Sequence, residues 1–120
     1  MATLEITRNE WQPFLDEFSR QHQGGRATVQ IIGEETGVQT EADSLPFVGI
    51  SAEDQGSEKG SIIVMLGTEA DDHVEHRISD ASHLWQKAAD DHAGDALEIE
   101  STDGTKTILL LEPTPLLQQE

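Results

Sequence analysis

The chain has 120 residues, the length of a single domain, and carries 24 acidic against 7 basic side chains, a net charge of −17. A field of that sign repels phosphates, which excludes nucleic-acid binding by charge neutralisation and argues against docking on an anionic membrane. The absence of cysteine excludes disulfide, thiolate and iron–sulfur chemistry. No apolar run approaches the roughly 18 residues of a membrane span, and the N-terminus does not resemble a signal peptide, so we expect a cytoplasmic protein.

The first predicted element is an amphipathic helix whose aromatic and apolar residues recur at helical spacing: Trp11, Phe14, Leu15, Phe18 and His22. Thr7 and Glu10 have the spacing of a capping box, and Ile6 precedes that cap as in a hydrophobic staple. Asn9 is the alternative cap, because it would place Pro13 in the first turn, where proline costs less. The helix is expected to end at Gly24-Gly25.

After the helix the apolar period changes to two, which is typical of strands. We expect strands at residues 26–33, 38–42, 45–52, 61–67 and 74–79. Polar turns or loops are expected between them, at residues 34–37, 53–60 and 68–72. A short helix is then predicted over Asp80–Asp90, capped by Ser79 or Asp80, from the spacing of Ala81, Leu84, Trp85 and Ala88.

The last element is predicted to be a β-hairpin around Asp103-Gly104, which fits a two-residue type I′ turn. That turn would set Ile99 opposite Ile108 and Leu97 opposite Leu110. Leu109 and Leu111 would then lie on the other face, so the last strand is apolar on both sides. The N-terminal helix is the expected cover for the second side, and a second subunit is the alternative.

These elements predict an α+β fold: an N-terminal amphipathic helix packed on a curled, mainly antiparallel sheet or small barrel of 5–7 strands, with a short helix before the C-terminal hairpin. Residues 1–112 are expected to form one domain. Residues 113–120, which begin at Pro113 and contain Pro115, are expected to be a loose tail.

The sequence from Asp71 to His76 is the richest polar cluster, and His83 follows it. Imidazole and carboxylate groups can bind zinc or iron, but residues three apart in a strand point to opposite faces, so His73 and His76 should diverge. No H-E-x-x-H pattern is present. We therefore predict no functional metal.

Nucleophilic catalysis also has little support in the sequence. Ser51 lacks the second glycine of a nucleophile elbow. Ser82 adjoins His83, but neighbours in sequence do not aim at each other as a triad requires. Lys59 does not complete a phosphate-binding loop. We assign no catalytic, cofactor-binding or metal residues and no cofactor.

The two tryptophans, Trp11 and Trp85, have two interpretations. A tryptophan on an amphipathic helix is usually a core residue. The alternative is that one of them lines a pocket or an interface, where tryptophan is enriched.

Three segments carry a resemblance to a known family: W-Q-P-F-L-D-E-F-S-R at residues 11–20, L-P-F-V-G-I at 45–50 and L-E-I-E-S-T-D-G-T at 97–105. With them the chain resembles, over roughly residues 5–112, a bacterial family catalogued only as a domain of unknown function. The resemblance implies a single domain. It implies no activity, cofactor or catalytic residue.

The favoured interpretation is a small, non-enzymatic protein that acts by binding or association. A homodimer is expected, because the strands at residues 62–66 and 108–111 present more apolar faces than one helix covers. One alternative is a metal-dependent enzyme using His73, His76 and His83 with nearby carboxylates. Another is an acidic nucleic-acid mimic that binds a basic protein. Neither nucleic acid nor membrane is expected as a partner, and the sequence identifies no particular protein partner.

Overall fold

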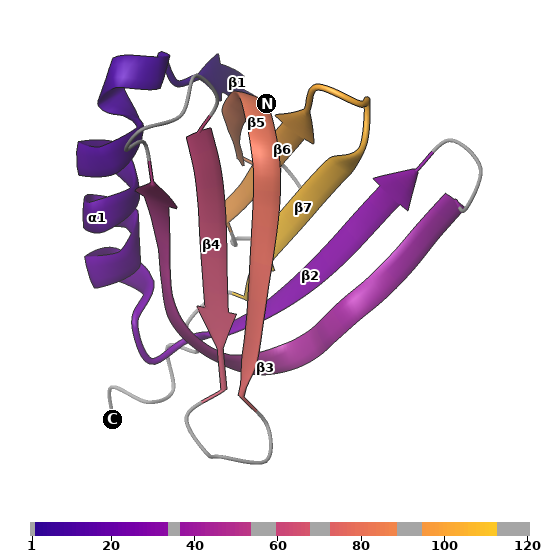
Figure 1. The fold of residues 1–120 in the computed structure, drawn as a ribbon. Coiled ribbons are helices and arrows are strands. Elements are labelled where there is room, and N and C mark those ends of the chain that lie inside the picture. The colour runs from indigo at the N-terminus through magenta and orange to yellow at the C-terminus, as the bar shows by residue number, and fades with distance from the viewer. Residues whose placement is uncertain (1, 34–36, 54–59, 68–72, 89–94, 113–120) are drawn as a thin grey trace.

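The structure is a computed structural model that describes residues 2–33, 37–53, 60–67, 73–88 and 95–112. One helix and seven strands follow one another along these residues (Figure 1). Their bounds are β1 (Ala2–Glu5), α1 (Trp11–His22), β2 (Arg26–Gly33), β3 (Gly37–Glu53), β4 (Gly60–Leu66), β5 (Val74–Ala88), β6 (Asp95–Ser101) and β7 (Lys106–Leu111), with a 3₁₀ turn, η1 (Arg8–Glu10), before α1.

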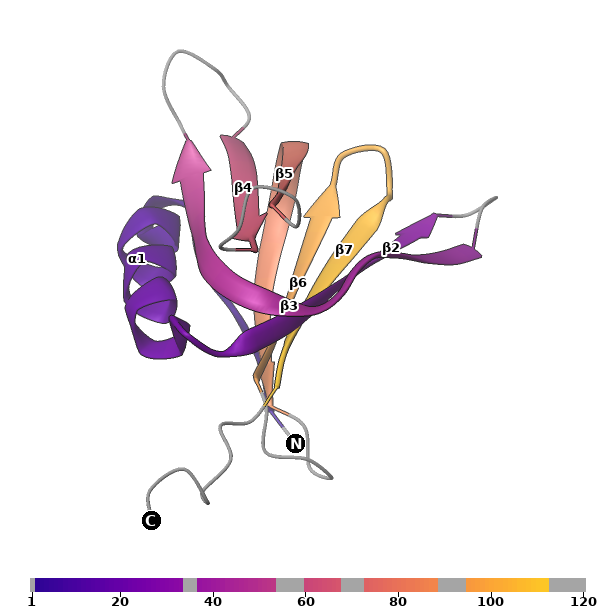
Figure 2. The ribbon, with the colours of Figure 1, turned by 90° about the horizontal axis from the view of Figure 1, so that it is seen from below.

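The strands form one antiparallel sheet in the order β1-β5-β4-β3-β2-β7-β6. Because β5 also pairs with β6, six of these strands close into a barrel, and β1 is added to β5 outside that closure. Helix α1 lies against β3 on one side of the barrel (Figures 1 and 2). The expected helix on a small antiparallel barrel is confirmed at this level, although helix makes up less of the chain than the sequence predicts.

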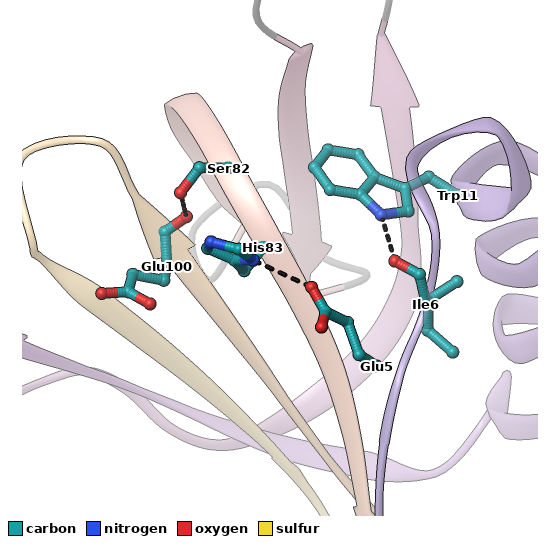
Figure 3. Close-up of polar contacts among 6 residues, drawn as sticks. All are labelled: Glu5, Ile6, Trp11, Ser82, His83 and Glu100. Carbon is teal, nitrogen blue, oxygen red and sulfur yellow. Dashed lines mark hydrogen bonds and ion pairs between the residues drawn. The ribbon is translucent and has the colours of Figure 1, made fainter.

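The start of α1 is set by a tryptophan rather than by a capping box. The Trp11 Nε1–H donates a hydrogen bond of 2.9 Å to the Ile6 carbonyl, and both residues are buried (Figure 3). The Thr7 hydroxyl donates to Asn9 Oδ1 instead of capping a backbone N–H. The predicted capping box is therefore wrong, and Ile6 meets Trp11 through its main-chain carbonyl, while both side chains belong to the buried core. Pro13 falls in the first turn of α1, where its missing N–H has no intrahelical partner to lose.

The predicted extent of α1 is confirmed at its other end. The helix stops at His22, and Gly24 takes a φ of +89°, which residues with a Cβ rarely adopt. Trp11, Leu15 and Phe18 are buried, and Phe14 is partly buried against the same core. The interior also holds apolar side chains from the six barrel strands, among them Val29, Phe47, Ile50, Ile62, Val64, Leu66, Ile78, Leu84, Leu97, Ile99, Leu109 and Leu111.

Strand β3 is one continuous strand where the sequence predicts two. Residues 37–46 pair with β2, and residues 47–53 pair with β4. Register shifts in β2–β3 and one between Phe47 and Gly49 give the strand extra residues, and such bulges bend a strand. Ser44 takes a φ of +58° at the point where a break is predicted. The polar residues there therefore form a bulge rather than a turn, and β3 contributes to both sides of the barrel.

Helix α1 takes the place of a neighbouring strand along the second half of β3. The Ser19 hydroxyl accepts a hydrogen bond from the Ile50 N–H and donates one to the Ile50 carbonyl, both at 2.9 Å. The Gln12 side-chain amide donates to the Ala52 carbonyl at 3.3 Å, and that of Gln23 donates to the Val48 carbonyl at 3.5 Å. Alternate residues of β3 thus find partners on the helix, which satisfies backbone groups that would otherwise form an open edge.

The predicted short helix over residues 80–90 is wrong where the structure describes it. Residues 74–88 form the single strand β5. Register shifts occur on both sides of Ala81, and Asp80 takes a φ of +56°. Each bulge adds one residue, so the inward-facing residues Ile78, Ala81 and Leu84 stand three apart. A spacing of three imitates the period of a helix, which explains the error.

The C-terminal hairpin is confirmed, but its predicted turn and register are wrong. The Gly104 N–H donates to the Ser101 carbonyl, and Gly104 alone in the turn has a positive φ, +92°. A type I turn followed by a left-handed glycine makes a three-residue loop rather than a type I′ turn. The one-residue difference offsets the pairing, so that Leu97 lies opposite Leu109 and Glu98 opposite Ile108.

The corrected register changes which residues of the last strand need a cover. Leu109 and Leu111 face the barrel interior and are buried, while Ile108 and Leu110 face outward and are half-buried. The expectation that α1 covers the second face of this strand is wrong, because α1 packs against β3, on the other side of the barrel (Figure 2). Most of the predicted turn at residues 34–37 and of the predicted loop at 53–60 lies outside the described residues, as do the turn at 68–72 and the tail at 113–120; Gly37, Glu53 and Gly60 are the ends of strands.

Candidate functional site

The three histidines proposed for a metal site do not come together. His76 lies opposite Val64 on the inner face of β5 and is half-buried, and burial lowers its pKa despite the opposing effect of the nearby Glu41 carboxylate. His83 lies on the outer face of β5, and His73 is exposed just before this strand. Within the described parts of the chain no three His, Asp or Glu side chains are grouped as metal ligands. Asp71 and Asp72 lie outside those parts.

The neighbouring Ser82 and His83 have separate partners. The Ser82 hydroxyl donates a hydrogen bond of 3.0 Å to the Glu100 main-chain carbonyl (Figure 3). The His83 Nδ1 atom lies 2.8 Å from Glu5 Oε2. The serine therefore satisfies the backbone at a bulge and is not activated by the histidine. Ser51 is half-buried in the paired part of β3, opposite Ile63.

A different group of side chains gathers on the outer face of β1, β5, β6 and β7. Cross-strand pairing places Glu5, Trp85, Glu98 and Ile108 in one row across these four strands. The residues two positions before and after these on each strand point to the same face, and they form the neighbouring rows. We call these residues the outer patch: Glu5, His83, Trp85, Lys87, Ala96, Glu98, Glu100, Lys106, Ile108 and Leu110.

The aromatic part of the outer patch lies on β5. The rings of His83 and Trp85 are stacked, with centroids 5.2 Å apart and planes at 14°. Glu5 lies opposite Trp85 on β1, and its Oε2 atom lies 2.8 Å from His83 Nδ1. Trp85 is half-buried, whereas Trp11 is 3% exposed in the core. The core interpretation is confirmed for Trp11, whereas Trp85 lies on the outer face of the barrel and its interpretation as a pocket or interface residue stays a prediction.

The centre of the outer patch is a buried carboxylate. Glu98 is only 7% exposed, although it lies on the outer face of the barrel. Its carboxylate oxygens lie 2.5 Å from Lys87 Nζ and 3.8 Å from Lys106 Nζ. These are two of only three lysines in the chain. A carboxylate this far removed from water needs such partners, because an unpaired buried charge is costly.

Sequence reasoning missed this group because it placed His83, Trp85 and Lys87 in a short helix and offset the register of β6 and β7 by one residue. In the predicted register Glu98 lies beside Leu109, with no lysine nearby. In the observed register Lys106 is diagonal to Glu98, two residues from its partner Ile108. One signal was available in the sequence. Lysine is scarce in this acidic chain, and two of its three lysines, Lys87 and Lys106, lie in or next to the segments that flank the predicted C-terminal hairpin.

The outer patch combines aromatic, aliphatic and charged side chains. It holds a stacked tryptophan, half-buried aliphatic side chains and charged groups that are already paired. Tryptophan and aliphatic residues surrounded by polar groups are the composition of protein–protein contact surfaces. Ser82 lies near the outer patch, and its hydroxyl is hydrogen-bonded to the backbone. The described residues therefore offer no activated nucleophile here.

Comparison with known proteins identifies a family of the kind that the sequence motifs suggest. Residues 2–119 match a family of unknown function (DUF5335), and the chain belongs to this family. An uncharacterised protein from Aquifex aeolicus (strain VF5) is 23% identical over 113 residues, which cover 94% of this chain and 95% of that protein. No solved structure is significantly similar to the chain. The predicted family resemblance is therefore confirmed.

In the part of the chain that the structure describes, no helix has the length and the apolar composition needed to cross a membrane.

Proposed function

We propose that this protein is a non-enzymatic association module that binds a protein surface through the outer patch. The observation that carries the proposal is the half-buried Trp85, stacked on His83, on the same face as the half-buried Ile108 and Leu110, which lie two strands away on the other side of β6. A side chain as large as tryptophan loses much water-contacting surface when a partner covers it, and this stabilises a complex.

The rest of the described molecule supports a scaffold role for the barrel. Its interior positions are occupied by buried apolar side chains, and His76 is the titratable group that faces inward among them. The runner-up function, a metal-dependent enzyme, lacks support because His76 and His83 lie on opposite faces of β5. The acidic-mimic hypothesis and the cytoplasmic location stay predictions from composition.

The proposed function can be tested by affinity capture with the purified chain immobilised on a resin. Wild type and Trp85→Ala are exposed to lysate of the source organism, and retained proteins are identified by mass spectrometry. Leu4→Ala is the matched control, because Leu4 is an exposed apolar residue, 59% exposed, on the neighbouring strand β1. We expect proteins that are retained by wild type and the control but lost with Trp85→Ala. Identical retention by all three chains would refute the outer patch as the binding surface.

A further inference from the structure

Resting on the proposed function, we infer that the partner of the outer patch is a second copy of this chain, in a two-fold symmetric homodimer. Two features of the described residues lead to this partner rather than to an unrelated protein. One is the local charge balance of the patch, and the other is the division of the patch into an aromatic half and an aliphatic half.

The charge balance decides where two such acidic chains can meet. Each chain carries −17, so two copies repel each other over most of their surfaces. The outer patch carries three carboxylates, Glu5, Glu98 and Glu100, against two ammonium groups, Lys87 and Lys106, a net charge of −1 with His83 neutral. Two copies can therefore approach through this face at little electrostatic cost. A strongly basic partner would gain little from so nearly neutral a face, and the exposed carboxylates elsewhere would attract it more.

The layout of the outer patch makes it complementary to itself. The aromatic half, His83 and Trp85, lies on β5, and the aliphatic half, Ile108 and Leu110, lies on β7. Strand β6 runs between the two halves and carries the ion-paired Glu98. A two-fold axis parallel to β6 lays the aromatic half of each copy on the aliphatic half of the other. One kind of contact is then made twice, as an isologous dimer requires.

Sedimentation equilibrium at about 0.15 M salt tests the dimer directly. We expect wild type at up to about 100 µM to approach a mass of about 26 kDa, twice the 13.2 kDa of one chain. Trp85→Ala and Lys87→Glu should each weaken dimerisation at least about tenfold, because the first removes the aromatic anchor and the second adds negative charge to both faces.

Arg20→Glu is the matched control for Lys87→Glu, because it changes the net charge by the same amount. Arg20 lies on the exposed face of α1, paired with Glu17 and away from the outer patch. Its dissociation constant should stay within about twofold of wild type. Equal weakening by both charge reversals would show that total charge governs association, which would overturn the assignment of the dimer to this face.

A measurement on wild type alone covers the case in which the variants fail to fold. Dilution of ¹⁵N-labelled protein from about 500 to 5 µM should shift the backbone amide signals of β5–β7 and leave those of α1 unchanged. A mass of about 13 kDa at every concentration, or shifts confined to other elements, would overturn the dimer. If wild type is monomeric and affinity capture still depends on Trp85, the partner is a different protein; the dimer is then refuted while the proposed function stands.

Discussion

Replacement of Ser19 by alanine tests whether helix α1 acts as the missing neighbour of strand β3. The Ser19 hydroxyl makes two hydrogen bonds of 2.9 Å to the backbone of Ile50, a residue that is 2% exposed. Each such bond contributes about 0.5–1.5 kcal/mol, and a buried backbone group left without a partner costs about 1–3 kcal/mol. Alanine regains up to about 0.5 kcal/mol of helix propensity. We expect Ser19→Ala to lower the free energy of unfolding by about 2 kcal/mol.

Urea denaturation followed by circular dichroism measures this loss. With a slope of about 2 kcal/mol per molar urea, the midpoint should fall by about 1 M while the slope stays constant. Ser19→Thr keeps the hydroxyl and should recover most of the stability. Gln12→Ala removes an exposed, longer bond of 3.3 Å and should cost no more than about 0.5 kcal/mol. If Ser19→Ala costs as little as Gln12→Ala, the helix does not stabilise β3 through this hydroxyl.

Phe18→Ala should lower the free energy of unfolding by about 3–5 kcal/mol in urea melts, because Phe18 is 2% exposed and its ring packs against the core. The control is Gln21→Ala, at an exposed site. A loss below about 1 kcal/mol for Phe18→Ala, comparable to that of the control, would contradict this packing. Burial lowers the pKa of His76 from 6.5, so the unfolded chain binds this proton more readily, and the contribution of His76 to stability should fall as pH drops below about 6.5. His76→Leu should remove this part of the acid sensitivity, whereas the exposed-site control His73→Leu should retain it, as thermal melts between pH 7 and 5 would show. The melting temperature should rise between about 0.01 and 1 M sodium chloride, because salt screens the repulsion within a chain of charge −17; a flat or falling profile in calorimetry would mean that repulsion does not limit stability.

Elements with an uninterrupted apolar period could be predicted from the sequence. The stripe from Trp11 to Phe18 identifies α1, and Gly24 marks its end because its positive φ suits glycine. The run from Ile62 to Leu66 identifies β4. The first segment follows one helical period and the second is an unbroken apolar run, so in both the local pattern and the tertiary structure agree.

Segments with bulges could not be predicted in the same way. An inserted residue changes the spacing of inward-facing side chains from two to three, as at Ile78, Ala81 and Leu84, and local sequence does not distinguish that spacing from a helix. The loop at Gly104 had a similar effect, because one residue of loop length decides which face each later residue occupies. The outer patch depends on that register, so it was accessible only once the pairing of β6 with β7 was known.

The closure of the barrel also determines when the chain can fold during its synthesis. Strand β2 is the first barrel strand to be made, yet one of its two neighbours is β7, which is made after the other five. In the barrel, β7 lies between β2 and β6. Until β7 is made, one edge of β2 and one edge of β6 therefore have no strand to pair with. The nascent chain therefore has to keep incomplete sheets from associating with one another, and its strong like charge opposes such encounters. High acidity, which limits how finished molecules can meet, would in this way also protect unfinished ones on the ribosome.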